Sequence, residues 1–423
     1  MILSNFVRSY RNFLLFVLSY SMKLFKKEGI IMKILSINAG SSSLKFQMYE
    51  MPEEKVLISG VFERIGINDS FYTIKVNGEK IKKDAVLSNH EDAVKILIDE
   101  LFENKVITSL EEIEGVGHRV VHGGSKYASS IVIDDDVIAA IKSFFDLAPL
   151  HNPANLLAIN AFTKALPSVK QVAVFDTSFQ QTMEPTEYIY PVPYEWYTEY
   201  GVRRYGFHGI SHNYLSERMS EILGKKEFKL ITCHLGGGCS IEAIENGKCV
   251  DSSLGFSPNA GLMMGTRCGD IDSQMIPYVM NKSGMSLDEV MNALNKKSGF
   301  IGVSGVSSDS RDIEAGVDNG DERCILAQQM FVNRCVDYIA KYYVKLGGVD
   351  AICFAAGLGE NSITTRKQII DKLAVLGIKI SDERNNVRGK ETLISSDDST
   401  VPVWIVPTDE ELMIAKDTYK FIK

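Results

Sequence analysis

Two arginines lie in short glycine-containing segments, and one aspartate directly follows an apolar run. Arg119 lies within residues 117–124, between two histidines, Arg267 lies between two glycines, and Asp176 directly follows an apolar run. Phosphoryl transfer needs cations around the oxygens of the moving group and carboxylates that bind magnesium. Together with Glu410, these residues supply such groups. Each also has a structural interpretation, because arginines form ion pairs and an aspartate can cap a helix.

Three turns rich in glycine or serine follow apolar runs, at residues 38–43, 235–240 and 354–362. Such a turn exposes backbone N–H groups that can bind phosphate oxygens. One turn of this kind commonly just closes a hairpin, but three of them favour a nucleotide site. No G-x-x-x-x-G-K-[ST] sequence occurs, and residues 38–43 lead into a predicted strand, so a P-loop is not predicted.

The sequence disfavours two other kinds of catalytic site. His208 and His212 have the spacing of two metal ligands on one turn of a helix. Gly206 and Gly209 disfavour a regular helix there, and no H-E-x-x-H motif is present, so a zinc site is not predicted. A G-x-S-x-G elbow is also absent, which argues against Ser-His-Asp hydrolysis.

The elements around the turns predict a duplicated α/β protein. Strands are predicted at 34–37 and 44–49 around the first turn, and again at 230–234 and 241–244 around the second. This repetition of strand, turn and strand indicates a long-period internal duplication. A further strand at 351–353 and amphipathic helices at 91–102 and 325–346 complete the pattern.

Length and composition favour a two-domain protein that acts on small molecules. The chain has 423 residues, a net charge of -8 and seven cysteines. The length suits two domains, and the acidic balance gives no reason to expect a nucleic-acid partner. An odd number of cysteines without a C-x-x-C pair predicts neither a disulfide framework nor a zinc site, and favours the reducing cytoplasm. Residues 32–423 contain no apolar run of membrane-spanning length, so no membrane partner is expected.

Residues 1–31 differ from the rest of the chain, with five Lys/Arg residues and one Glu. The apolar run at 13–18 is too short for a convincing signal peptide, and no clear cleavage site follows it. Back-translation of residues 26–29 contains a purine-rich bacterial ribosome-binding sequence just before Met32. We therefore expect residues 1–31 to be a non-native upstream extension and Met32 to be the true start.

Five segments in their usual order resemble the signatures of the acetate kinase family: residues 37–45, 117–124, 207–209, 265–272 and 408–412. The resemblance covers nearly the whole chain from Met32. It implies reversible phosphorylation of acetate by ATP to give acetyl phosphate and ADP, with Mg²⁺ or alternatively Mn²⁺. It also implies a homodimer and two duplicated actin-like, ribonuclease H-like domains with a nucleotide cleft between them. The expected domains are 32–178 plus about 408–423, and 179–407, which carries the nucleotide site.

The resemblance also implies roles for individual residues. The implied catalytic residues are Arg119, Asp176, His208 and Arg267, with His151 in support. The implied metal ligands are Asn38 and Glu410. The substrate carboxylate and acyl group would contact Arg119, Val121, Leu150, Phe207 and Pro258. The implied nucleotide-binding residues are Lys45, His234, Gly236, Gly237, Gly238, Asp309, Ser310, Arg311, Gly357, Leu358, Gly359, Glu360 and Asn361.

Two positions depart from the family pattern. Gly237 stands where asparagine is usual, and Cys268 stands where serine is usual after the arginine. The triple glycine at 236–238 resembles butyrate kinases, so a propionate or butyrate kinase is the alternative interpretation. A non-catalytic, nucleotide-binding actin-like protein is the alternative from another class. Retention of both arginines argues against it, because nucleotide binding alone does not need a carboxylate-binding arginine.

Overall fold

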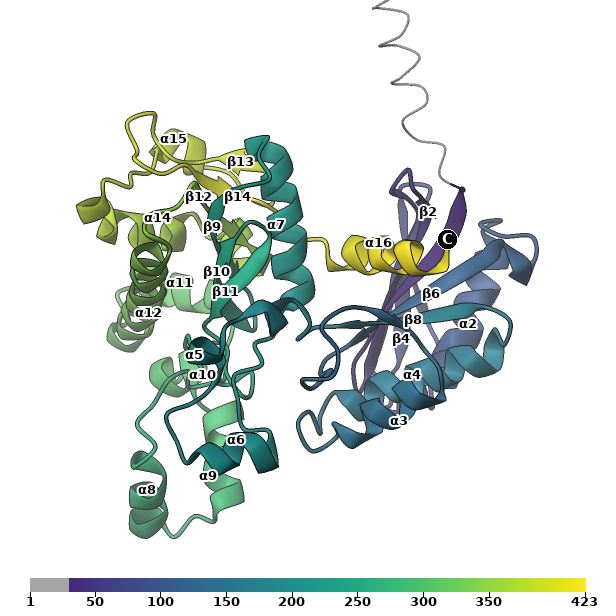
Figure 1. The fold of residues 1–423 in the computed structure, drawn as a ribbon, viewed down its shortest axis with the longest axis horizontal. Coiled ribbons are helices and arrows are strands. Elements are labelled where there is room, and N and C mark those ends of the chain that lie inside the picture. Colours follow the sequence, from purple (N-terminus) through teal and green to yellow (C-terminus); the bar gives the residue numbers. More distant parts are fainter. Residues whose placement is uncertain (1–29) are drawn as a thin grey trace, which may run out of the picture. The chain divides into compact units, whose positions relative to one another are not determined.

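The computed structural model describes residues 30–423, which form two compact units (Figure 1). The first unit contains the described chain up to His118, Leu157–Val172 and Ile414–Lys423, and the second contains Arg119–Leu156 and Ala173–Met413. The predicted upstream extension falls outside the described residues, apart from residues 30 and 31. The predicted domain boundaries after 178 and before 408 stay a prediction.

The first of two sheets starts from the predicted hairpin. Strands β1 (Met32–Ala39) and β2 (Ser43–Met51) pair antiparallel, and β1 also pairs parallel with β6 (Ile113–Val120). The strand order is β5-β4-β3-β2-β1-β6-β8-β7. The other strands are β3 (Lys55–Glu63), β4 (Phe71–Val76), β5 (Glu79–Asp84), β7 (Ile131–Val132) and β8 (Lys170–Phe175). Its helices and 3₁₀ turn are α2 (His90–Glu103), η2 (Leu110–Glu112), α3 (Asp135–Ser143), α4 (Asn152–Ala165) and α16 (Glu410–Ile422).

The second sheet repeats the arrangement of the first. Its order is β11-β10-β9-β12-β14-β13, with β9 antiparallel to β10 and parallel to β12. The antiparallel hairpin followed by a parallel strand therefore occurs in both sheets, as the predicted duplication requires. The strands are β9 (Lys229–Leu235), β10 (Cys239–Glu245), β11 (Lys248–Ser252), β12 (Ala351–Ala355), β13 (Thr392–Leu393) and β14 (Val403–Ile405).

Helices cover both faces of the second sheet. Ile231 and Cys233 of β9 share a buried cluster with Phe331 of α12 (Glu322–Leu346), whereas Leu230 shares another with Leu215 of α7 (Gly209–Leu223). Neighbouring residues of a strand face opposite sides, so α12 and α7 cover opposite faces, and Figure 1 shows them on either side of the strands. None of the helices described here is long and apolar enough to cross a membrane.

The remaining helices and 3₁₀ turns of this unit connect the strands. They are η3 (Phe179–Thr182), α5 (Pro185–Tyr188), α6 (Tyr194–Tyr200), α8 (Met275–Ser283), α9 (Leu287–Lys296), α10 (Gly299–Ser304), α11 (Ser310–Asp318), α13 (Ala356–Asn361), α14 (Ile363–Lys372), η4 (Ala374–Leu376) and α15 (Asp382–Asn385). Most of the turn predicted at 354–362 is helix α13. It closes because the Glu360 carboxylate accepts a hydrogen bond from the Ala356 backbone N–H at 2.7 Å.

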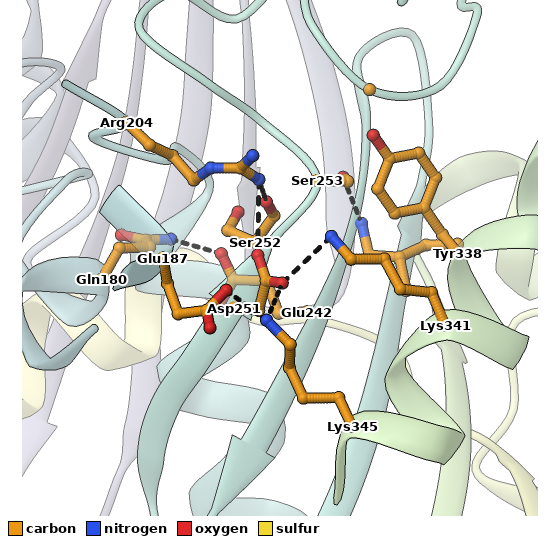
Figure 2. Close-up of polar contacts among 12 residues, drawn as sticks. Gln180, Glu187, Arg204, Glu242, Asp251, Ser252, Ser253, Tyr338, Lys341 and Lys345 are labelled. Atoms are coloured by element: carbon orange, nitrogen blue, oxygen red, sulfur yellow. Dashed lines mark hydrogen bonds and ion pairs between the residues drawn. The ribbon is translucent and has the colours of Figure 1, made fainter. Parts of the chain in front are cut away.

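A buried ion network joins β11 to α12 (Figure 2). Asp251 of β11 lies 3.0 Å from the Lys341 ammonium, 2.5 Å from that of Lys345 and 3.3 Å from the Arg204 guanidinium. Burial opposes ionisation of Asp251, but these cations hold its pKa below the usual value. The network therefore anchors α12 and the segment around Arg204 against the edge of the sheet.

Candidate active site

The centre of the candidate site is an ion pair between Arg119, near the end of β6, and Asp176, just after β8. The Arg119 Nη2 and Asp176 Oδ2 atoms are 2.8 Å apart, and the Asp176 side chain is 1% exposed. Burial alone would raise the pKa of Asp176, but the positive charge of Arg119 outweighs it and the pKa is lowered. Burial likewise opposes the charge of Arg119, yet Asp176 and Glu410 raise its pKa. Both groups are therefore charged at neutral pH.

His208 is held against this ion pair by its backbone. It precedes α7 with a φ of 60°, its N–H donates to Asp176 Oδ2 at 3.2 Å, and the Gly209 N–H donates to the Asp176 carbonyl at 2.8 Å. A Cβ on Gly209 would lie only 2.5 Å from that carbonyl oxygen. The expected interruption is confirmed at His208, which lies outside the helix in a left-handed conformation, whereas α7 begins at Gly209 and contains His212. The glycine serves the close approach to Asp176.

His208 and Arg267 converge beside Gly238. A Cβ built on Gly238 would lie 3.2 Å from His208 Nε2 and 3.5 Å from Arg267 Nη1. The Arg267 guanidinium donates to the Pro258 carbonyl at 3.0 Å, which orients it. Burial lowers the pKa of Arg267, but an arginine stays charged in proteins. Burial also lowers the pKa of His208 to about 4, so its ring is neutral at pH 7.

His151 lies within the electrostatic field of the same groups. Burial lowers its pKa, the charges of Arg119 and Arg267 lower it further, and Asp176 opposes them. The positions predicted for the acyl pocket differ in exposure. Val121 and Phe207 are buried in one apolar cluster, Pro258 is half-buried, and Leu150 is 66% exposed.

Two of the predicted phosphate-binding segments lie close together in the second unit. A Cβ on Gly236, in the β9–β10 turn, would lie 3.4 Å from the Ala356 Cβ and 3.9 Å from the Gly357 nitrogen. A Cβ on Gly237 would meet nothing within 4 Å, so this position has room for a side chain. Cys268 is half-buried, and its thiol donates to the Gly269 carbonyl at 3.2 Å.

The other predicted nucleotide positions in the second unit lie at the start of α11, within α13 and in β9. Asp309 caps α11, where its carboxylate accepts from the Arg311 N–H at 2.9 Å and pairs with the 86% exposed Arg311 side chain. Leu358 and Gly359 are buried in α13, and the Asn361 amide donates to the Gly357 carbonyl. His234 is buried, and its ring stacks on that of His208 with centroids 4.3 Å apart.

The predicted metal ligands are divided between the units. Asn38 and Lys45 belong to the first unit, where they face each other across the β1–β2 hairpin. Glu410 belongs to the second unit and begins α16. In residues 30–423 no group of three or more His, Cys, Asp or Glu side chains is arranged to hold a metal ion.

Sequence reasoning missed a set of buried polar residues behind His208: Thr232, Ser240, His212, Glu242 and Gln180. A signal was present, since Ser240 and Glu242 alternate with apolar residues along β10 and His212 follows His208 by one helical turn. From the sequence alone, the spacing of His212 from His208 indicated only a candidate metal ligand.

Comparisons with known proteins agree with one another. The profile of the Acetokinase family matches residues 33–416. A curated acetate kinase of Bacillus cytotoxicus is 53% identical over 390 residues, which cover 92% of this chain and 98% of that protein. The crystal structure of Porphyromonas gingivalis acetate kinase is similar with a TM-score of 0.88, 46% identity and coverage of 93% and 100%. A propionate kinase structure from Francisella tularensis also has a TM-score of 0.88, with 40% identity and the same coverage.

Proposed function

The chain belongs to the acetokinase family, and we infer from this that it is an acetate kinase, which phosphorylates acetate with ATP in a reversible reaction. The main structural support for this function is that His208 and Arg267 both approach the space beside Gly238, which has no side chain. The Arg119–Asp176 ion pair belongs to the same candidate site. The duplicated sheets of the chain agree with the expected actin-like α/β fold.

The charges in the site suit direct in-line transfer. Arg119 would bind the acetate carboxylate, with Asp176 fixing the guanidinium. Arg267 would contact the transferring phosphoryl group, and His208 Nε2 would donate to its oxygens as charge spreads over them. Val121 and Phe207 would enclose the methyl group. A neutral histidine is suited to this role, because it donates a hydrogen bond without adding a third positive charge beside the two arginines.

We also propose a magnesium ion, with manganese as a substitute. The carboxylate of Glu410 is a hard oxygen donor near Arg119, and the buried Asp176 Oδ1 has no hydrogen-bond partner among the described residues, so these groups fit the ion. Glu410 and Asn38 would hold it. When bound, magnesium would neutralise charge on the phosphate oxygens of ATP. The adenosine side would contact residues 309–311 and 357–361.

A hydroxylamine trap for acyl phosphate tests the function. Purified protein is incubated with ATP, magnesium and acetate, and the acyl hydroxamate is measured. Product with acetate is expected, and none when EDTA replaces magnesium. Absence of product with acetate, propionate and butyrate would instead favour the non-catalytic nucleotide-binding protein.

The same assay tests the acyl chain length. Each added methylene changes discrimination by about 1–3 kcal/mol, so kcat/KM for propionate should be about 10- to 200-fold below that for acetate. Turnover of propionate should remain measurable. A butyrate optimum would reassign the substrate class and leave the phosphoryl-transfer site intact.

The Gly237→Asn variant tests the missing family asparagine. Because a side chain at this position would meet nothing within 4 Å, we expect normal folding and a kcat within about threefold of the wild type. One additional hydrogen bond to phosphate is worth about 0.5–1.5 kcal/mol, which predicts a KM for ATP lower by about 2- to 10-fold. An unchanged KM in steady-state kinetics would show that residue 237 does not contact the nucleotide.

We propose a cytoplasmic homodimer. All seven cysteines are free thiols, as expected in a reducing compartment. A cavity of about 1090 Å³ is lined in part by the exposed apolar side chains of Ile271, Met275 and Met330, which a second copy could cover. Sedimentation of the purified 47.0 kDa chain as a monomer would contradict the dimer.

A further inference from the structure

A continuous line of hydrogen bonds runs from His208 into the core. His208 Nδ1 lies 2.8 Å from the Ser240 hydroxyl, which lies 2.7 Å from His212 Nε2. His212 Nδ1 then lies 2.7 Å from the Thr232 hydroxyl. Thr232, Ser240 and His212 are all 0% exposed, so water cannot replace any of these contacts. Each contact contains one proton. The donor in one contact therefore constrains which atom donates in the next.

With neutral rings, only two directions use the proton of the Ser240 hydroxyl within this line, and the arrangement in which both rings donate to Ser240 would leave that buried proton without a partner in the line. Burial lowers the pKa of His208 to about 4 and that of His212 well below its usual value, so each ring carries one proton. In one direction His208 donates from Nδ1 to Ser240, which leaves a lone pair on Nε2. In the other direction Ser240 donates to His208 Nδ1, which leaves the proton on Nε2, beside Gly238 and Arg267. Only the second direction gives a donor that faces the site.

A neighbouring contact selects between the two directions. The Gln180 amide donates to the Phe207 carbonyl at 3.1 Å and to Glu242 Oε1 at 2.6 Å, and Figure 2 shows this amide pointing at the carboxyl group. A flipped amide would bring its oxygen against both acceptors. The Phe207 carbonyl therefore fixes the orientation of Gln180, and Glu242 Oε1 must accept.

Glu242 in turn selects the tautomer of His212. Its Oε1 atom lies 3.9 Å from His212 Nε2. A lone pair on that nitrogen would face the lone pairs of this acceptor oxygen, whereas an N–H presents a positive edge to them, which favours the proton on Nε2. Burial raises the pKa of Glu242 to about 8, and because Oε1 accepts from Gln180, a proton on this carboxyl group would reside on Oε2. The oxygen facing His212 is an acceptor in both ionisation states.

We propose that Ser240 and His212, oriented by Glu242 and Gln180, are positioning residues that hold the proton of His208 on Nε2 and so make it a hydrogen-bond donor to the transferring phosphoryl group. The role of that donor rests on the proposed function, but the tautomer does not. His212 Nε2–H donates to Ser240, the Ser240 hydroxyl donates to His208 Nδ1, and Thr232 donates to His212 Nδ1. No covalent bond changes in this arrangement.

Solid-state ¹⁵N NMR of the full chain labelled with ¹⁵N-histidine tests the tautomer directly. The chain has seven histidines, and the His208→Gln and His212→Gln variants identify two of them by difference. At pH 7 we expect a protonated Nε2 and an unprotonated Nδ1 on both rings. A protonated Nδ1 on His208 would overturn the proposal. Because the spectrum needs no turnover, it remains decisive even if no acyl phosphate is formed.

Kinetics of a matched set of variants test the consequence. Ser240→Ala removes the group that donates to His208, and His212→Leu removes the donor behind it. Loss of the partners that orient a metal-binding histidine typically costs about 10- to 100-fold, and we expect a loss of this size in kcat here, with KM for acetate and ATP within about threefold. His212→Gln keeps an N–H near the position of Nε2 and should retain kcat within about fivefold. Equal losses in the glutamine and leucine variants would contradict a role for that N–H.

Discussion

Replacing Arg119 with alanine is expected to lower kcat for acetyl phosphate formation by about 10³-fold or more. Arg119 would hold the acetate carboxylate, which is the attacking nucleophile, so its guanidinium would also lie beside the transferring phosphoryl group, where a correctly placed arginine contributes about 10³ to 10⁵ to the rate. The side chain of Arg119 is 20% exposed and therefore accessible to a substrate, while Asp176 holds its guanidinium in one orientation. The expected loss corresponds to about 4–7 kcal/mol of barrier.

Two further variants make this result specific. Arg119→Lys keeps a positive charge beside Asp176 but lacks the two-pronged guanidinium, so most of the loss should remain. Arg384→Ala removes a 38% exposed arginine that pairs with the 87% exposed Asp397, and it should leave kcat unchanged. Steady-state kinetics at saturating acetate and ATP measure the effect, and circular dichroism checks the fold. Full activity of the lysine variant would show that charge alone is required.

Much of the fold could be predicted because its signals are local. The hairpins β1–β2 and β9–β10 alternate regularly around glycine turns, and their repetition revealed the duplication. Helix α12 begins at Glu322, three residues before the predicted start, because the Asp321 side chain accepts from the Cys324 N–H. A cap of this kind shifts a boundary without changing the apolar pattern.

For the candidate site, the sequence predicted the residue types but not their arrangement in space. Arg119, Asp176, His208 and Arg267 were recognisable from their motifs, but their pairing depends on where β6, β8 and α7 end in space. Gly209 illustrates the difference. In the sequence it resembles a helix breaker, whereas in the fold it allows the backbone to approach the Asp176 carbonyl. Contacts between distant segments, such as Gln180 with Glu242, leave no periodic signal.

Removing Asp176 should cost both activity and stability. In Asp176→Ala the Arg119 guanidinium would lose the carboxylate that lies 2.8 Å away, and the His208 backbone N–H would lose its acceptor. Breaking a buried ion pair from one side typically costs about 3–5 kcal/mol of unfolding free energy. The site would also lose the group that orients Arg119, so kcat should fall by about 10²-fold. Urea unfolding and steady-state kinetics measure the two effects.

The double variant Arg119→Ala/Asp176→Ala separates the charge effect from the loss of packing. If an uncompensated guanidinium causes the instability, the double variant should be more stable than Asp176→Ala alone.

The pH dependence of stability gives a second check. The folded-state pKa of Asp176 is lowered, so its stabilisation is complete above the unfolded-state pKa of about 3.9 and is lost as pH falls through the folded-state value. The difference in unfolding free energy between wild type and Asp176→Asn should therefore shrink in that acidic range. An unchanged difference there would show that ionisation of Asp176 does not stabilise the fold.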